Sequence, residues 1–100
     1  MSLVGNLKEI QEKAIDEKVI EFAEEMEGVI TRSAANGYSG YMYQIHKENS
    51  DAHIMRSKVF AEKLQMLMDG VKVDYKREEK KMLITGFTYY EHYIHFKWND

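Results

Sequence analysis

The first thirty residues carry two hydrophobic stripes, each with the alternating three- and four-residue spacing of an α-helix. The stripes consist of Leu3, Leu7, Ile10 and Ala14, and then of Ile15, Val19, Phe22, Met26 and Val29. At about 100° per residue, the second stripe is rotated roughly 115° from the first. The pattern predicts either a helix that breaks near Asp16, with that residue as N-cap, or one helix that uses two faces.

The length of this region bears on its packing. Thirty helical residues extend about 45 Å at about 1.5 Å each, whereas a domain of this size has a radius of gyration of about 13 Å. An unbroken helix would therefore project beyond its own core and leave a stripe exposed. We expect a homo-oligomer in which Leu3, Leu7 and Ile10 contact a second copy. The alternative is a short first helix that folds back onto the domain.

Further along, the pattern alternates between strand and helix. Gly37 suits the left-handed residue that ends a helix. Residues 41–46 alternate as a half-buried strand does, and residues 50–69 have the broad apolar stripe of a helix that covers a sheet. Gly70 ends this second helix as Gly37 ends the first.

The C-terminal third is rich in strand patterns. Residues 71–75, 82–88 and 93–98 are predicted strands, with a charged turn at 77–80 and an ambiguous connection at 89–92. In the last strand we assign the wholly apolar set to the core, namely Ile94, Phe96 and Trp98.

This order of elements predicts an α+β fold in a single domain over residues 1–100. An acidic helical region at 1–36, with a long or broken helix, precedes a sheet with one helix at 37–100. A strand–helix–strand unit normally joins parallel strands, and hairpins join antiparallel ones. We therefore expect a mixed four-stranded sheet with helices on one face.

Charge and composition narrow the function. Residues 1–30 carry eight acidic and three basic side chains, while the remainder is mildly basic, for a net charge of −3. The negative net charge argues against a general nucleic-acid binder. The acidic helix is either a solvated face or a surface for a basic partner. No cysteine supplies a thiol nucleophile or a zinc ligand. With no secretory signal and no membrane-spanning run, we expect a cytoplasmic protein without membrane contact.

Candidate chemistry is sparse. The four histidines are His46, His53, His92 and His95. His92 and His95 are three apart on or beside a strand, and an odd separation points strand side chains to opposite faces. His46 and His53 could converge only if the loop between them folds them together. Ser39 lies between glycines but lacks the strand-to-helix context of a nucleophile elbow. We expect no metal, no cofactor and no enzymatic activity, and rank a small enzyme of unknown class third among functions.

Two sets of side chains suggest binding. A tyrosine side chain combines an apolar ring with a polar hydroxyl. The candidates for a protein contact, or for the sheet edge, are Tyr89, Tyr90 and Tyr93. Basic residues gather near Tyr75 as they do in proteins that follow a single nucleic-acid strand. These are Lys72, Lys76, Arg77, Lys80 and Lys81.

An acidic helix that ends in Ala34-Ala35-Asn36-Gly37-Tyr38-Ser39, and strands that close on Ile94-His95-Phe96-Lys97-Trp98, resemble small uncharacterised accessory proteins of Gram-positive phages and prophages. The resemblance spans residues 15–98 and carries no diagnostic motif. It implies a cytoplasmic protein that binds a host or phage protein. We therefore expect a non-enzymatic protein-binding or self-assembling module, with nucleic-acid binding as the alternative.

Overall fold

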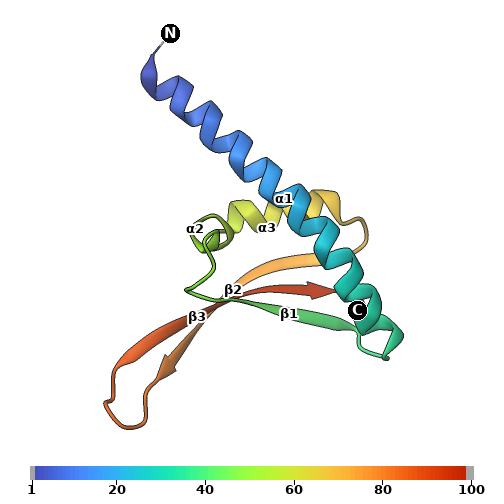
Figure 1. Ribbon diagram of the computed structural model, residues 1–100. Helices are drawn as coiled ribbons and strands as arrows, with labels where there is room; N and C mark the ends of the chain where they lie inside the picture. The colour runs from blue at the N-terminus through green and yellow to red at the C-terminus, as the bar shows by residue number, and fades with distance from the viewer. Residues whose placement is uncertain (1, 99–100) are drawn as a thin grey trace.

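The computed structural model describes residues 2–98, and its longest element is the helix α1 (Leu3–Ala35). This helix runs without interruption through Asp16 (Figure 1). Ser2 is its N-cap, and the Ser2 hydroxyl accepts a hydrogen bond from the backbone N–H of Gly5 at 3.1 Å. The two stripes are thus two faces of one helix, as one prediction had it. The break at Asp16 and the folded-back first helix are wrong.

Gly37 ends α1 as predicted. Its φ angle is 91°, in the left-handed region that favours glycine. The Gly37 N–H donates to the Ala34 carbonyl and the Tyr38 N–H to the Ser33 carbonyl, both at 3.0 Å. This pair of bonds is a Schellman motif, which satisfies carbonyls that the last turn would leave free.

The remaining elements follow in chain order: β1 (Gly40–Ile45), α2 (Ala52–Met55), α3 (Lys58–Leu67), β2 (Lys72–Lys81) and β3 (Thr88–Lys97). The helix predicted over residues 50–69 is therefore two helices. The division falls at Ser57, whose extended backbone and side chain cap α3: its hydroxyl accepts from the Phe60 N–H at 3.1 Å.

The sheet has three strands in the order β1-β3-β2, and both outer strands pair with β3 antiparallel. The outer strands are parallel to each other but do not touch, because β3 lies between them. The prediction of a mixed four-stranded sheet is thus wrong in its strand number and in its parallel pairing. The α+β class is confirmed.

The predicted fourth strand is absent because two neighbouring segments each adopt the structure that was predicted for the other. Residues 77–80, predicted as a turn, continue β2, and residues 82–87, predicted as a strand, form the turn between β2 and β3. Gly86, with a φ angle of 74°, makes this turn rather than a bulge. The hydrophobic run suggested a strand packed on a core, but no core surface reaches this part of the chain.

Helices α1 and α3 cover one face of the sheet (Figure 1). The ring of Phe22 in α1 packs against Phe60 of α3 and Phe96 of β3. It also lies edge-on to Tyr43, at 4.9 Å between ring centroids. Ile94 and Phe96 are fully buried, and Trp98 is partly buried, which confirms their inward assignment. On α1 only the second stripe reaches this core.

Two parts of the chain project beyond the core: the first half of α1 and the β2–β3 hairpin (Figure 1). The radius of gyration is 15.9 Å, and the extents are 51 × 41 × 22 Å. A compact chain of this length has a radius of about 13 Å. The projections account for the excess, and they are where the candidate functional residues lie.

Candidate functional site

The first projection, called the α1 overhang, comprises residues 3–14, every one of which is exposed. Leu7 and Ile10 are 53% and 58% exposed, and Leu3 and Val4 more so. The structure therefore brings together Leu3, Leu7 and Ile10 on one uncovered face, where the sequence placed them. Val4 adds to that apolar surface and was missed, although it lies three positions before Leu7 and so shares the helical spacing.

Ion pairs hold the base of the overhang. The Lys63 Nζ of α3 lies 2.7 Å from Asp16 Oδ1 and 3.7 Å from Glu12 Oε1. The hydrogen bond to Asp16 is the main cause that raises the pKa of Lys63 above its usual value. Lys18 lies 3.1 Å from Asp51 Oδ2, which precedes α2. These contacts fix the direction in which the overhang leaves the core.

The second projection is the hairpin arm, the part of β2 and β3 beyond β1. The last pair of β1 is Ile45 with His92, and the β2–β3 ladder continues for four more pairs, from Glu78↔Glu91 to Lys81↔Thr88. At about 3.3 Å per residue this arm is roughly 13 Å long. It presents the turn at residues 82–87 away from the rest of the molecule.

The end of the arm, called the hairpin tip (residues 82–87), is apolar and open. Leu83 and Ile84 are essentially fully exposed, Ile84 at 98%, and Phe87 is 71% exposed. Two backbone bonds close the turn: Met82 N–H to Phe87 O and Gly86 N–H to Met82 O, each 2.9 Å. Sequence reasoning missed this surface. The available signal was the charged run on its N-terminal side, which is unusual for a strand next to a core.

The three candidate tyrosines do not form one surface. Residues of β3 alternate between the covered and the open face, so Tyr89 and Tyr93 lie on the open face and Tyr90 on the other. The Arg77 guanidinium sits over the Tyr90 ring at 4.7 Å. The Tyr93 hydroxyl donates to the Glu91 carboxylate, which raises the pKa of Tyr93 to about 12.

The candidate basic residues are likewise divided. Lys72, Lys76 and Lys80 lie on the open face of β2, and Arg77 and Lys81 on the other. Acidic neighbours share the open face: Lys80 Nζ is 3.3 Å from Glu78 Oε2, and Lys72 Nζ is 4.0 Å from Asp74 Oδ2. The strand therefore offers alternating charge, not a continuous basic track.

Tyr75 and His92 meet at the base of the arm. Their rings stack at 5.9 Å, and the Tyr75 hydroxyl and His92 Nδ1 share a hydrogen bond of 2.5 Å. Burial is the main cause that lowers the pKa of His92, and the charges of Arg56 and Arg77 add to it. The geometry favours a neutral imidazole that joins β2 to β3.

His92 and His95 lie on opposite faces of β3, as their odd separation on a strand predicts. His92 faces the covered side of β3 and His95 the open side, while His46 directly follows β1 and His53 lies in α2, both exposed. Within residues 2–98, no three histidine or acidic side chains gather in a way that could hold a metal ion. In the same described part of the chain, no helix combines the length and the apolar character needed to cross a bilayer.

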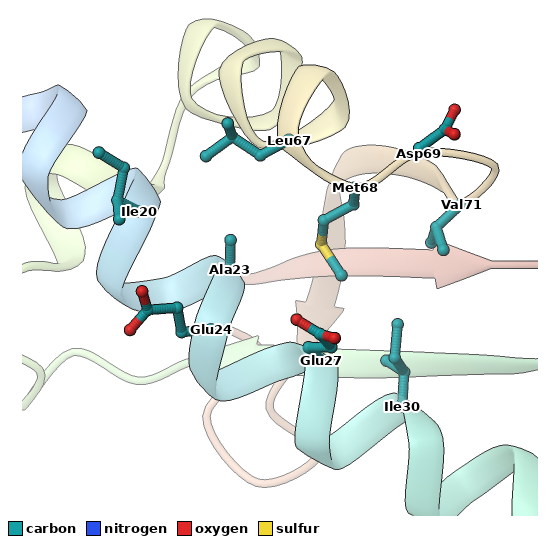
Figure 2. Close-up of a pocket in the computed structure, with 9 residues that line it drawn as sticks. All are labelled: Ile20, Ala23, Glu24, Glu27, Ile30, Leu67, Met68, Asp69 and Val71. Atoms are coloured by element: carbon teal, nitrogen blue, oxygen red, sulfur yellow. The ribbon is translucent and has the colours of Figure 1, made fainter.

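A hollow between α1 and the end of α3, called the α1–α3 groove, encloses about 420 Å³ (Figure 2). Its walls are apolar and its rim is acidic. The apolar side chains are Ile20, Ala23, Ile30, Leu67, Met68 and Val71, and the rim carboxylates are Glu24, Glu27 and Asp69. Sequence reasoning missed the groove, since residues far apart in the chain build it.

The Gln65 side chain fixes one wall of the groove. Its amide donates to the Val71 carbonyl at 2.5 Å and accepts from the Val73 N–H at 2.7 Å. These bonds tie α3 to the connection that follows it and to the start of β2. The groove is consequently a built feature of the fold and not a gap beside a loose loop.

Comparison of the chain with protein-family models, curated proteins and solved structures gives no match. The geometry described above therefore carries the functional argument.

Proposed function

We propose that the protein is a non-enzymatic self-assembling module in which the α1 overhang packs against the α1 overhang of a second copy. The observation that supports this is the exposed stripe of Leu3, Leu7 and Ile10 on a helix end beyond the reach of its own core. Apolar side chains gathered on one side of a fixed helix lose contact with water only when a partner covers them.

The spacing of the stripe suits packing between two helices. The stripe consists of Leu3, Leu7, Ile10 and Ala14. The intervals between them are four, three and four, as between the a and d positions of heptads. The same spacing next reaches Glu17 and Glu21. Because buried carboxylates oppose such packing, the contact ends near Ala14, where the overhang also ends.

The size of the overhang sets the strength of this contact. Residues 3–14 form a helix about 18 Å long. Stable interfaces bury about 800 Å² on each partner, which is more than one side of so short a helix provides. We therefore expect association that depends on protein concentration.

We further propose a cytoplasmic protein encoded by a Gram-positive phage or prophage, with a host or phage protein as an additional partner. The resemblance of residues 15–98 supports this origin, and the overhang suits a protein partner. The nucleic-acid alternative has weaker support, because the basic residues of β2 lie on both faces and alternate with acidic ones.

Sedimentation analysis over a range of concentrations tests the assembly. The variant Leu7→Gln/Ile10→Gln should lose the association that the overhang provides, and should therefore associate more weakly than the unaltered protein at every concentration. The matched control is Lys8→Gln/Glu9→Gln, which makes two changes on another side of the same turns, keeps the net charge and should associate normally. A single copy for the unaltered protein at the highest concentration would refute the proposal.

A further inference from the structure

We propose a second contact between copies, in which the hairpin tip of one copy inserts into the α1–α3 groove of another. This contact uses residues separate from the α1 overhang and does not depend on the function proposed above. It accounts for two features that the overhang leaves unexplained, an apolar turn in full contact with water and an apolar groove with an acidic rim.

The tip presents a defined apolar shape. Its two backbone hydrogen bonds and the left-handed Gly86 hold the turn, while Leu83, Ile84 and Phe87 point outward with little contact to the rest of the chain. Soluble proteins seldom leave several large apolar side chains together in water unless a partner covers them. The arm of β2 and β3 carries this group clear of the sheet.

The groove has the size and the lining of a site that can receive apolar side chains. A volume of about 420 Å³ lies at the lower end of the range of about 300–1,000 Å³ that specific binding pockets occupy. Figure 2 shows aliphatic side chains from both helices around the hollow and the Met68 thioether reaching into it. Methionine adapts its shape to an inserted side chain, because its thioether is flexible and polarisable.

Charge complements the apolar match. Glu24, Glu27 and Asp69 stand exposed at the groove, and none of them forms an ion pair within residues 2–98. Lys81 stands directly before the tip and is likewise unpaired in that described part. Insertion of the tip would bring Lys81 to the carboxylates of the rim, which directs the approach and its orientation.

The contact must join different copies. In one chain, the tip points away from the connection after α3 that forms part of the groove (Figure 1). Each copy thus offers one tip and one groove, a head-to-tail arrangement that forms chains or closes into rings. An apolar tip with nearby lysines also suits an anionic membrane surface. The matching groove in the same molecule favours a second copy.

The decisive experiment mixes two variants, each with one half of the contact. Both carry Leu7→Gln/Ile10→Gln, so that the α1 overhang takes no part. One adds Ile84→Asp, which spoils the tip, and the other adds Leu67→Asp, which spoils the groove. Each alone should remain a single copy by sedimentation. Their mixture should form a one-to-one complex, because one copy retains a groove and the other retains a tip.

A matched control is Val59→Asp in place of Leu67→Asp. Both residues lie in α3 and both are 53% exposed, but Val59 is not part of the groove. The Val59→Asp protein should associate as its parent does. Mixtures that fail to combine, or a Leu67→Asp protein that associates as well as the control, would overturn the proposal.

Reversing the charges on the two sides of the contact gives an independent test, because the residues changed are exposed and outside the core. Lys81→Glu alone and Glu24→Lys/Glu27→Lys alone should each weaken the apparent Kd about tenfold or more. Mixing the two should recover part of the affinity. Binding to phosphatidylserine vesicles is measured as well. The tip would be assigned to a membrane if the protein binds these vesicles tightly, if Ile84→Asp abolishes that binding, and if no association between copies depends on the groove.

Discussion

At the scale of single residues, two glycines of the first helical region have opposite effects on the helix. Gly37 lies just beyond α1, where its φ angle of 91° turns the chain toward β1. Gly28 lies inside the helix, and a Cβ added there would meet only the far end of the Arg32 side chain, at 4.0 Å. The same substitution should therefore change stability in opposite directions.

We expect Gly37→Ala to lower the free energy of unfolding by about 1 kcal/mol, because alanine is strained at positive φ. We expect Gly28→Ala to raise it by about 0.5–1 kcal/mol, since alanine loses less conformational entropy in a helix than glycine does. Urea unfolding followed by circular dichroism measures both. Equal shifts in one direction would contradict the role of Gly37 at the end of the helix.

The histidines of β3 make stability depend on pH. Burial lowers the pKa of His92 and of His95 relative to the unfolded chain, so the folded state binds fewer protons. Their contribution is complete above the unfolded pKa of about 6.5 and is lost as pH falls below it through the folded pKa. The stability of the protein should decline over that window.

Urea midpoints measured between about pH 7.5 and about pH 5 test this dependence. The variant His92→Gln should show a shallower decline, because one of the two groups that take up protons on unfolding is gone. His53→Gln, at an exposed position of α2, serves as the control and should keep the original slope. If the urea midpoint of His92→Gln depends on pH as steeply as that of the unaltered protein, the half-buried His92 imidazole does not contribute to the pH dependence.

At the scale of elements, the α1 overhang and the hairpin tip extend well beyond what folding requires. Residues 3–14 are exposed throughout, and residues 82–87 are exposed as well. An element that buries little contributes little to the free energy of unfolding. Both should be removable without loss of the core, although their removal should abolish assembly.

Replacement of residues 82–87 by an Asn-Gly turn tests this for the arm, because that dipeptide suits a two-residue hairpin. We expect the free energy of unfolding to change by less than about 1 kcal/mol. The contrasting variant Phe96→Ala removes a fully buried ring and should cost about 3–5 kcal/mol. A large loss on shortening the turn would mean that the tip supports the fold.

At the scale of the whole molecule, two proposed contacts differ in their physical basis. The stripe on the α1 overhang consists of aliphatic side chains, whereas the hairpin contact also brings Lys81 to three carboxylates of the groove. Two weak contacts acting together produce assemblies more stable than either alone. Salt should distinguish them, because ions screen attraction between exposed charges.

We expect assemblies of the unaltered protein to become smaller as salt rises from about 50 mM to about 500 mM, since screening weakens the hairpin contact. The Ile84→Asp variant, which keeps only the overhang contact, should change little over the same range. Light scattering coupled to gel filtration measures both. A salt response in Ile84→Asp equal to that of the unaltered protein would argue that the overhang carries the electrostatic part.

Much of the local structure could be predicted from the sequence. The helical spacing, the alternation in residues 41–46 and the glycines after the helices are local signals, and the helix, the strand and Gly37 followed them. Ile94 and Phe96 could be assigned inward because alternation divides a strand into two faces. The exposed overhang followed from a comparison of helix length with domain size.

The hairpin arm and the groove could not be predicted in this way. Residues 82–87 have the apolar composition of a buried strand, and composition does not tell whether a core surface lies opposite. The three tyrosines are close in sequence, but the two faces of β3 separate Tyr90 from Tyr89 and Tyr93. Ile20 and Leu67 are forty-seven positions apart and line the same groove only because α1 packs against α3.

Most element types, the apolar faces of helices and strands, and the uneven charge therefore follow from the sequence, because they depend on neighbours a few positions apart. The tertiary structure alone decided that α1 is unbroken, that the sheet has three antiparallel strands and that an apolar turn stands in water. Those outcomes depend on which distant surfaces meet, and packing between them overrides the local preference of each segment.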